Sequence, residues 1–568
     1  MNPYGIDFGT TNSVLAEWTG RRVDVLPIDN PPGAWTQMGF DKVMPSVLGI
    51  LPDGGTRFGW AAKRLTEGKL EAVKRLFATD DSVEVGGRRV DVEEAAALLF
   101  GHIRSASPGV DVRRAVVTIP ANSRGRARLR TKLCAGLAGI EVQALLNEPT
   151  AAAMAYSVDA TRDQNVLVFD WGGGTLDVTV LETIEGVFIE RASKGIPRSG
   201  GIDLDEAFGR AILDALPSRP SWSPAQQAQF RLEVERAKIL LSSQDEVNLA
   251  LPGDVFFPAT RELFVKAIAP YLDEARRPIE QCLADLSITP GSIDQLVMVG
   301  GSSKIPAARA MVSEVLHREP AGGCDPMTAV AQGAAIASAI LLGQLDKDFF
   351  VATEHALGTV VHNDRDRPEF SVLIPRNHQL PAKATDGYRP AVQGQEAVRV
   401  KVIEGDPTKP VDHEDNVILR EWTVPVDPDL PPDQNAFTIT YEYNVDGILH
   451  INVVGVRSGQ VMLDDDVSWG VTKDKTKLVE LAKRVSTTIE SGSVGAGSPV
   501  RSSAHVSDPE VAALTARART KVMPFVGDEE AKRLEAICVD LEHAEGAGLA
   551  ECKEALSGAL RQYAYLLV

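Results

Sequence analysis

Two glycine-rich turns carry the side chains of this sequence that are best suited to phosphate chemistry. The first turn lies in residues 166–180, where glycines 172–174 are flanked by Asp170, Thr175 and Asp177. Glycine lets the backbone approach a bulky anion, and consecutive N–H groups of a turn can bind phosphate oxygens. Asp170 follows an apolar run typical of a buried strand, where its carboxylate is suited to hold a hydrated divalent cation.

A similar turn lies near the N-terminus, where residues 5–14 read Gly-Ile-Asp-Phe-Gly-Thr-Thr-Asn-Ser-Val. It too follows a short apolar strand, and Asp7 stands just before it. One such turn alone is equally compatible with a tight hairpin and is weak evidence for nucleotide binding. Two copies predict a duplicated nucleotide-binding unit whose turns face one cleft.

Composition excludes several classes of function. The chain has 568 residues with 44% hydrophobic content, enough for several domains, and its net charge of −19 argues against nucleic acid as a partner. Its five cysteines include no C-x-x-C pair, so they form neither a disulfide framework nor a zinc site. The first strand begins at about residue 4, which leaves no room for a signal peptide. The apolar run 329–342 is too short to span a bilayer. We expect a cytoplasmic protein without a membrane partner.

The apolar pattern changes along the chain and predicts several domains. Strand-like and helix-like segments alternate in the first part, as in an α/β fold. Residues 397–403 then alternate strictly, and Asp446-Gly447 is a tight hairpin signal, so an antiparallel β domain follows. The predicted parts are an α/β nucleotide-binding domain (1–346), a linker (347–353), a β domain (354–470), an amphipathic helix (471–490), a flexible Gly/Ser tether (491–507) and a helical bundle (508–568).

The order of four motifs resembles that of the DnaK-type heat-shock chaperones, the seventy-kilodalton family, over nearly the whole chain. They are Ile-Asp-Phe-Gly-Thr-Thr-Asn-Ser (6–13), Asn-Glu-Pro-Thr-Ala-Ala-Ala (147–153), Phe-Asp-Trp-Gly-Gly-Gly-Thr-Leu-Asp-Val (169–178) and Val-Gly-Gly-Ser-Ser-Lys-Ile-Pro (299–306). The resemblance implies an actin-like, ribonuclease H-like duplicated α/β ATPase domain, an antiparallel β-sandwich that binds peptides, and a C-terminal α-helical lid. It implies an ATP-driven chaperone with ATP or ADP and Mg²⁺ as cofactors, and K⁺ as a further candidate cation.

The resemblance also assigns catalytic roles. Asp7 and Asp170 would hold Mg²⁺ through water, and Lys74 would meet the γ-phosphate and orient the attacking water. Such positioning and charge neutralisation are what phosphoryl transfer to water requires. The catalytic set would be completed by Glu148, Thr175 and Asp177. An outward-facing strand carboxylate is an alternative interpretation of Asp177.

Further residues would bind the nucleotide. Lys304 stands where the family has an arginine stacked on adenine, and Met327 replaces an acidic residue, so both depart from the family pattern. A lysine cannot stack as a plane, which predicts a weaker clamp on the base. The implied nucleotide-binding residues are Gly9, Thr10, Thr11, Asn12, Gly172, Gly173, Gly174, Thr175, Gly200, Gly201, Glu235, Lys238, Ser242, Gly300, Gly301, Ser302 and Lys304.

Interdomain communication shows both matches and departures. Pro120, Arg128 and Glu148 match the family's relay from the γ-phosphate to the domain interface. The arginine that usually meets a J-domain co-chaperone is Ala144 here, and the second acid of the linker is Thr353. A J-domain protein and a nucleotide exchange factor are therefore candidate partners whose usual contacts are altered.

In the β domain the resemblance assigns Val398 to the central pocket of a peptide cleft, with Val400 beside it. Ordinary sandwich core is an equally good interpretation of each valine. The favoured function is an ATPase that binds and releases unfolded or client polypeptides. The alternative is a nucleotide-switched protein dedicated to one partner, with little turnover. A metabolite kinase or filament former on the same fold is disfavoured by the β domain and the tethered helices.

Overall fold

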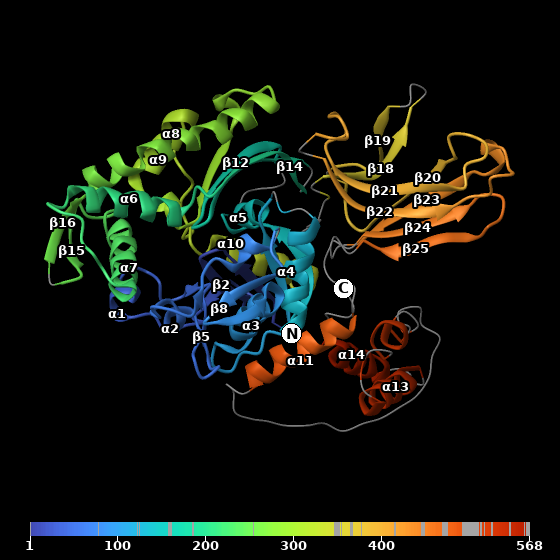
Figure 1. Cartoon of the computed structure of the whole chain (residues 1–568), viewed down its shortest axis with the longest axis horizontal. Helices are drawn as coiled ribbons and strands as arrows, with labels where there is room; N and C mark the ends of the chain where they lie inside the picture. Colours follow the sequence, from blue (N-terminus) through green and yellow to red (C-terminus); the bar gives the residue numbers. More distant parts are fainter. Residues whose placement is uncertain are drawn as a thin grey trace.

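A computed structural model gives the fold of the chain (Figure 1). The residues that it describes are 2–77, 79–121, 123, 125–156, 162–184, 187–253, 255–345, 353, 355–363, 367–376, 378–413, 416–444, 449–467, 475–490, 511, 514–515, 517–523, 526, 528–542, 544, 547–561 and 563. Most of the predicted linker and the whole tether of residues 491–507 lie outside the described residues.

The first part of the chain forms lobe I around a mixed sheet with the strand order β11-β10-β1-β2-β3. β1 runs parallel to β10, which runs parallel to β11, while β1, β2 and β3 are joined antiparallel. The short strand β4 also pairs with β2. The strands are β1 (Tyr4–Phe8), β2 (Asn12–Trp18), β3 (Val23–Leu26), β4 (Met44–Pro45), β10 (Arg114–Ile119) and β11 (Glu141–Asn147).

Lobe II is built around a second sheet with the order β14-β13-β12-β17. The first strand β12 pairs antiparallel with β13 and parallel with β17, and β13 pairs antiparallel with β14. The same order and directions relate β1, β2, β3 and β10, so the two sheets repeat one unit, as the two glycine turns predict. The strands are β12 (Gln164–Trp171), β13 (Thr175–Ile184), β14 (Val187–Pro197) and β17 (Gln295–Val299).

Helices cover both sheets. The apolar run near residue 330 forms α10, which packs against β1, β2, β10 and α5 and is a buried core helix, as its composition predicts. The helices of lobe I are α1 (Gly33–Gln37), α2 (Gly59–Lys63), the 3₁₀ helix η1 (Val73–Leu76), α3 (Val92–Ser105), α4 (Gly125–Leu137), α5 (Glu148–Ala155) and α10 (Ala329–Leu341). Those of lobe II are α6 (Gly201–Ala215), α7 (Pro224–Leu240), α8 (Arg261–Asp285), η2 (Pro290–Ser292), η3 (Gly301–Lys304) and α9 (Pro306–Leu316).

The two lobes also contain small antiparallel sheets. One has the order β6-β5-β7, and two hairpins pair β8 with β9 and β15 with β16. Figure 1 shows the β15–β16 hairpin at the outer end of lobe II, next to α7. The strands are β5 (Leu48–Ile50), β6 (Thr56–Phe58), β7 (Lys69–Leu70), β8 (Ser82–Val85), β9 (Arg88–Asp91), β15 (Glu246–Leu251) and β16 (Val255–Thr260).

The next part of the chain forms a sandwich of two antiparallel sheets, with orders β19-β18-β21-β22 and β20-β23-β24-β25. Alternating residues of β23 and β24 are buried between the sheets, and the hydroxyl of Tyr441 donates to the carbonyl of Gly358 at 2.8 Å. The elements are β18 (Ala356–His362), β19 (Pro368–Ile374), β20 (Ala382–Tyr388), β21 (Ala397–Gly405), β22 (Val417–Pro425), η4 (Pro432–Gln434), β23 (Phe437–Tyr443), β24 (Leu449–Gly455) and β25 (Val461–Asp466).

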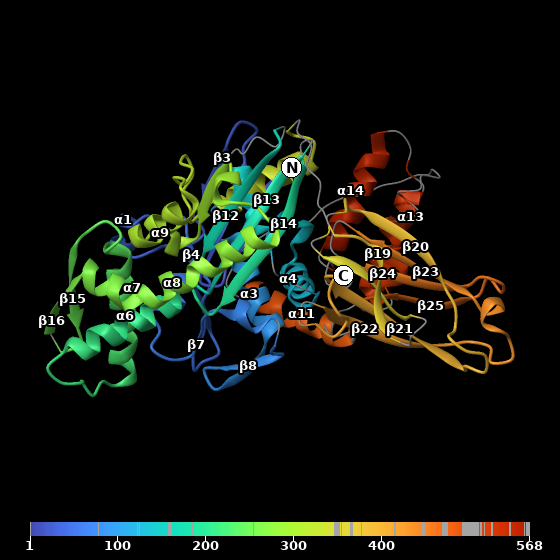
Figure 2. The same cartoon turned by 90° about the horizontal axis from the view of Figure 1, so that it is seen from above.

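The sandwich lies beside the ATPase-type lobes in both views of the molecule (Figures 1 and 2). Arg376, between β19 and β20, lies 3.5 Å from the carboxylate of Glu190 on β14. Glu190 is buried and also accepts a hydrogen bond of 3.0 Å from the side-chain amide of Asn147. Glu190 therefore takes part in one polar contact with the β domain and in another with β11 of lobe I.

The C-terminal part is helical. Helix α11 (Lys475–Glu490) covers the amphipathic segment predicted at 471–490, and its residues 478, 481, 482 and 485 are buried. It packs on α3 and α4 of lobe I (Figure 1). The remaining elements are the π-helical turn η5 (Ala518–Val522), α13 (Asp528–Glu542) and α14 (Ala547–Arg561).

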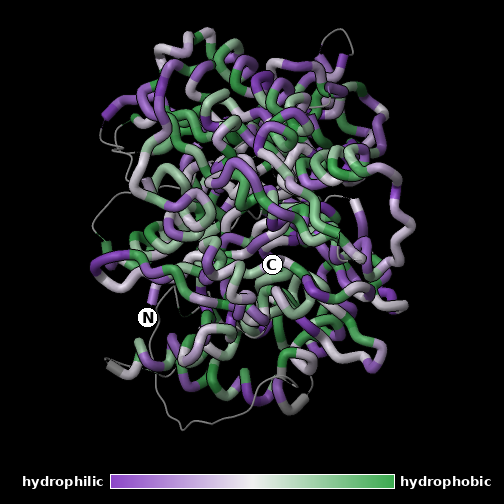
Figure 3. Tube along the Cα trace, turned by 90° about the vertical axis from the view of Figure 1, so that its left-hand side faces the viewer, coloured by the Kyte–Doolittle hydropathy of each residue, from purple (hydrophilic) through white to green (hydrophobic). Residues whose placement is uncertain are grey.

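Hydrophobic and hydrophilic stretches alternate along the whole trace (Figure 3). Within the described part of the chain, none of the helices combines the length and the hydropathy needed to cross a bilayer. The apolar segments are instead used in the cores of the lobes, the sandwich and the helical part.

Candidate functional site

The two glycine turns face each other across the gap between the lobes. A Cβ atom built on Gly173 would lie 2.1 Å from Oγ1 of Thr11, and one on Gly174 would lie 2.6 Å from Cγ2 of Thr10. No side chain fits at either glycine without separating the two turns. The structure therefore brings together the two motifs that the sequence analysis placed in one cleft.

Lys74 lies next to these turns on the short helix η1. Its Nζ donates to Oε1 of Glu148 at 2.8 Å, and both side chains are largely buried, at 10% and 14% exposure. Glu148 is the first residue of α5, where a carboxylate also interacts favourably with the helix dipole. The ion pair thus holds the lysine at the carboxylate side of the cleft.

Asp7 and Asp170 end the equivalent strands β1 and β12 of the two lobes, and Asp177 pairs with Asp170 in the ladder between β12 and β13. Burial and the charge of Glu148 raise the pKa of Asp7 to about 7. Burial raises the pKa of Asp170 well above its usual range, with further contributions from Glu148 and Asp177. Crowded carboxylates of this kind repel one another, and a divalent cation would relieve that repulsion.

The described residues include no group of three or more His, Cys, Asp or Glu side chains arranged to bind a metal directly. Asp7 and Asp170 instead fit a cation held through its water ligands, which is how Mg²⁺ is commonly bound. Oδ1 of Asp7 also accepts a hydrogen bond of 3.2 Å from Thr118, and Oδ2 of Asp177 accepts one of 2.9 Å from Thr175. These bonds orient the carboxylates toward the cleft.

Arg75 belongs to the site but was not predicted from the sequence. Its Nη2 donates to the carbonyl of Gly174 at 2.7 Å and lies 3.1 Å from Oδ2 of Asp203 at the start of α6. The same carboxylate oxygen accepts from the amide of Gly200 at 2.8 Å. Arg75 therefore links η1 of lobe I to the glycine turns of lobe II. Its position directly after Lys74 was the available signal.

A cavity of about 1300 Å³ opens between the lobes beside the turns, which is large enough for a nucleotide. Ten predicted nucleotide-binding residues line it: Thr11, Asn12, Gly173, Gly201, Glu235, Lys238, Ser242, Gly301, Ser302 and Lys304. The others, Gly9, Thr10, Gly172, Gly174, Thr175, Gly200 and Gly300, lie in the adjoining turns and do not line the cavity. Lys74 and the carboxylates likewise lie next to it rather than in its wall.

The turns are held in place by hydrogen bonds to backbone carbonyls. Ser302 donates to the carbonyl of Gly172 at 3.0 Å, and Ser46 donates to that of Gly9 at 2.8 Å. Gly300 has a φ of 82°, and a Cβ there would lie 2.4 Å from the carbonyl of Trp171. A glycine is therefore required where β17 meets the first glycine turn.

Two ion pairs lie in the wall of the cavity. Lys63 on α2 pairs with Glu235 on α7 at 2.7 Å, and Lys238 pairs with Asp205 at 2.7 Å. The first pair joins lobe I to lobe II. Burial raises the pKa of Asp205 to about 6, despite the nearby ammonium of Lys238.

An aromatic wall next to these pairs was missed by the sequence analysis. The Nζ of Lys63 lies 5.3 Å from the ring centroids of both Trp35 and Trp60. Trp35 comes from the short helix α1, and Met38 just after it lines the cavity together with Met327. Only the tertiary fold brings residues 33–40 to the cavity, so periodicity gave no signal for them.

Two cavity residues predicted to flank the adenine base, Lys304 and Met327, are those that depart from the family pattern. Lys304 lies at the end of η3, and its Nζ pairs with Oδ1 of Asp325 at 2.7 Å. The carboxylate of Asp325 thus balances the charge of Lys304, and the side chain of Met327 adds apolar surface to the cavity wall. Trp171, by contrast, is fully buried beneath the glycine turn, and its indole donates to the carbonyl of Ser199 at 2.6 Å.

The predicted relay residues lie in one region of lobe I. Pro120 follows β10, Arg128 is buried on α4, and Glu148 begins α5. Ala144 is fully buried on β11, so this position presents no charge to a co-chaperone. Thr353 is buried too, and its hydroxyl donates to the carbonyl of Pro375 at 2.7 Å.

The structure buries both valines proposed for a peptide cleft. Val398 is 8% exposed and Val400 is 2% exposed, and both belong to the large hydrophobic cluster that includes the sandwich core. The arrangement described here therefore presents them as core residues, and their role in peptide binding stays a prediction.

A duplicated α/β fold with two facing glycine turns, a buried lysine and crowded carboxylates defines a two-lobed class of protein whose cleft is suited to binding phosphate. Comparison with known proteins gives the family: residues 72–465 match the model of the family described as Hsp70 protein, and the chain belongs to the Hsp70 family.

Named relatives agree with this family. The chain is 34% identical to a protein named Chaperone protein DnaK from Thermus thermophilus over 492 residues, which cover 79% of this chain and 77% of the relative. A protein of the same name from Thermosipho africanus is 31% identical and covers 84% of both chains. A third, from Cenarchaeum symbiosum, is 33% identical and covers 79% of this chain and 70% of the relative.

Proposed function

We propose that this chain is an ATP-dependent chaperone that hydrolyses ATP between its lobes and couples hydrolysis to binding and release of unfolded polypeptides by the β-sandwich. The facing glycine turns, with Gly173 against Thr11, are the observation that carries the proposal. They offer backbone N–H groups to phosphate oxygens from both lobes, so one nucleotide would hold the lobes together. The related DnaK proteins, which are named chaperones, support the same function.

Each side chain of the site has a role in hydrolysis. Mg²⁺, held through water by Asp7 and Asp170, would neutralise phosphate charge. Lys74 would place its ammonium at the γ-phosphate and orient the attacking water, while Glu148 fixes the lysine through their 2.8 Å ion pair. Thr175 and Asp177, hydrogen-bonded at 2.9 Å, would accept and orient water beside the turn. Such positioning and charge stabilisation account for most of the catalysis of phosphoryl transfer.

Contacts that join the parts of the chain support coupling between the nucleotide and peptide sites. The sandwich meets lobe II through Arg376 and Glu190, and α11 lies on lobe I. A nucleotide that changes the spacing of the lobes would alter both contacts, and by linkage a bound peptide would alter nucleotide turnover. The alternative of a single dedicated partner has no support among the relatives.

The proposal is tested by peptide release. A fluorescent unfolded peptide is bound to the full chain in ADP and Mg²⁺, and its dissociation is followed after addition of ATP and Mg²⁺. We expect ATP to accelerate release by about tenfold or more, the size of a typical coupling energy. Equal release rates in ATP and ADP would reject nucleotide-controlled peptide binding, while failure to bind any peptide of a broad panel would reject the chaperone function itself.

The pair of Lys63 and Glu235 should slow nucleotide release, because it joins the two lobes at the wall of the cavity. Lys63→Met removes the cross-lobe pair and its contacts with the indoles of Trp35 and Trp60. Since a partly buried pair with cation–π support contributes about 1 kcal/mol, we expect ADP to dissociate about fivefold faster. Stopped-flow release of a fluorescent ADP measures this rate. Lys266→Met, at an exposed position on α8, is the control, and unchanged release in Lys63→Met would remove the pair from this role.

A further inference from the structure

Arg130 on α4 is a fully buried arginine that the functions assigned so far do not use. Its side chain has no solvent exposure. Nε donates to Oε1 of Glu93 on α3 at 2.8 Å, and Nη2 donates to Oδ1 of Asp81 at 2.6 Å. A buried guanidinium is costly to desolvate unless its donors are satisfied, and here all three nitrogen atoms have acceptors.

The remaining donors of Arg130 hold the segment that follows Lys74. Nη1 donates to the carbonyls of Leu76 at 3.3 Å and Phe77 at 2.9 Å, and also to that of Asp80. The amide of Phe77 in turn donates to the carbonyl of Lys74 itself at 3.2 Å. The guanidinium therefore fixes the backbone into which the proposed catalytic lysine is built.

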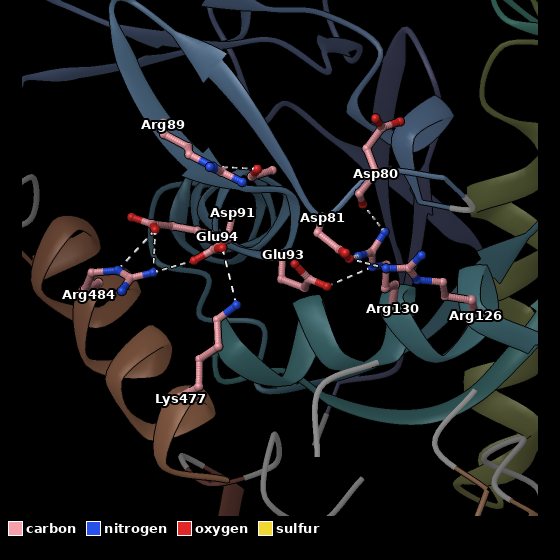
Figure 4. A network of polar contacts seen from close by, with 11 residues as sticks. Asp80, Asp81, Arg89, Asp91, Glu93, Glu94, Arg126, Arg130, Lys477 and Arg484 are labelled. Atoms are coloured by element: carbon pink, nitrogen blue, oxygen red, sulfur yellow. Dashed lines mark hydrogen bonds and ion pairs between the residues drawn. The ribbon is translucent and has the colours of Figure 1, made fainter. Parts of the chain in front are cut away.

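The same arginine ties this segment to the start of α3. Glu93 lies in the first turn of α3, and the carbonyl of Asp81 accepts from the amide of Val92, the first residue of that helix, at 3.0 Å. Figure 4 shows Arg130 between the acidic residues of the segment and those of α3. A shift of the Lys74 segment would therefore move the first turn of α3 with it.

The first turn of α3 is also where α11 docks. Nη2 of Arg484 lies 2.8 Å from Asp91 and 2.9 Å from Glu94, which flank Val92 and Glu93 in sequence (Figure 4). Further along, a Cβ on Gly101 would lie 2.1 Å from Cδ1 of Ile489, so α11 rests directly on the α3 backbone there. Glu93 and Glu94 are neighbours that bind Arg130 on one side and Arg484 on the other.

We propose that Arg130 is a positioning residue that links Lys74 to the docking of α11. The path runs from the backbone after Lys74 through the guanidinium of Arg130 to Glu93, and from the adjacent Glu94 to Arg484. The contacts along this path are hydrogen bonds or ion pairs of 3.3 Å or less, and Glu93 and Glu94 are joined by the backbone of α3. Because coupling is reciprocal, the state of the nucleotide site would bias α11 docking, and docking would adjust the position of Lys74.

Arginine is required for this role. Its planar group offers five N–H donors in a fixed fork, whereas a lysine offers one flexible ammonium. Arg130→Lys keeps the charge that balances Glu93 but cannot bridge Glu93, Asp81 and the backbone carbonyls at once. It is therefore expected to break the link and retain the fold. Circular dichroism and exchange protection of the buried middle of α3 check that the variant is folded.

The first test measures hydrogen exchange of α11 in the full chain with ATP and with ADP. We expect wild-type protection of residues 475–490 to differ between the nucleotides, and Arg130→Lys to reduce that difference by about fivefold or more, within the range of allosteric coupling. Arg126→Lys is the matched control, because Arg126 lies on the same helix and also pairs with Asp81, but within the described part of the chain it has no hydrogen bond to α3 or to the backbone after Lys74. A full nucleotide difference in Arg130→Lys would overturn the inference.

The second test changes Arg484 on α11, at the other end of the proposed path. Arg484→Ala removes the contacts with Asp91 and Glu94 and leaves the 3.5 Å pair of Lys477 with Asp91. Because the side chain of Arg484 is 41% exposed, the fold is expected to tolerate the change. We expect this change to alter the single-turnover rate of ATP hydrolysis about threefold or more in wild type and to have little effect in Arg130→Lys, since coupled sites are non-additive. If the effects of Arg484→Ala and Arg130→Lys on the single-turnover hydrolysis rate were additive, the proposed link would be overturned.

The inference rests on the proposed ATPase function, but the two fail differently. Absence of ATP-stimulated peptide release rejects the proposed function and leaves the exchange measurement informative. If the hydrogen-exchange protection of α11 were the same with ATP and with ADP, the link through Arg130 would be rejected, even if ATP were hydrolysed and peptide released.

Discussion

Lys74→Ala is expected to lower ATP turnover by about 10³-fold while nucleotide binding is retained. Removal of one preorganised charged donor from a phosphoryl-transfer site typically costs about 10²–10³ in rate, and here the attacking water would lose its orienting group as well. The affinity is retained because the facing turns and the cavity residues do not depend on Lys74.

The measurement is single-turnover hydrolysis of radiolabelled ATP, with affinity obtained from a fluorescent nucleotide. Lys74→Ala leaves Glu148 without its ion-pair partner, so Lys74→Ala/Glu148→Gln separates the loss of the ammonium from the effect of an unpaired carboxylate. Lys266→Ala on the exposed face of α8 is the control. Hydrolysis in Lys74→Ala within tenfold of wild type would remove the lysine from the chemistry.

Gly173→Ala is expected to weaken ATP binding by about 100-fold. The added methyl group would lie 2.1 Å from Oγ1 of Thr11, so the two turns must separate before any nucleotide can contact both. Overpacking of this kind costs about 1–3 kcal/mol, and its upper part corresponds to the expected loss of affinity. Isothermal titration with ATP and Mg²⁺ measures the effect.

Thr11→Gly removes the three atoms nearest the added methyl group and should partly restore affinity in the double variant. Gly322→Ala, where an added methyl group meets no atom within 4 Å, controls for the general effect of alanine. If Gly173→Ala bound ATP as tightly as wild type, the turns would not approach each other this closely in the nucleotide-bound protein.

Local features of the sequence were sufficient to predict the repeated sheets and the facing turns. Asp7 and Asp170 both follow short apolar strands, and such strands end at equivalent edges of the two sheets. The alternation in residues 397–403 likewise predicted β21. These features depend on residues close together in sequence, so the spacing of apolar and polar residues predicts them directly.

Residues that act across long sequence distances were not predictable in this way. Arg75 contacts Asp203, Lys63 contacts Glu235, and Arg130 contacts both the segment after Lys74 and α3, all through the tertiary fold. A single arginine in the Arg-rich segment 124–130 gives no signal that it will be buried. The alternation around Val398 and Val400 fits a peptide cleft and a sandwich core equally well. Both side chains are buried in the structure, and their role in peptide binding stays a prediction.

Nucleotide turnover and polypeptide binding are proposed to be coupled in this one chain. Steady-state ATP turnover of the full chain, measured with and without a saturating unfolded peptide and repeated with a J-domain protein, tests this coupling most directly. We expect the peptide alone to raise turnover about fivefold or more, within the usual range of coupling between sites. Turnover that is the same with every peptide of a broad panel, in the presence and absence of the J-domain protein, would contradict the account.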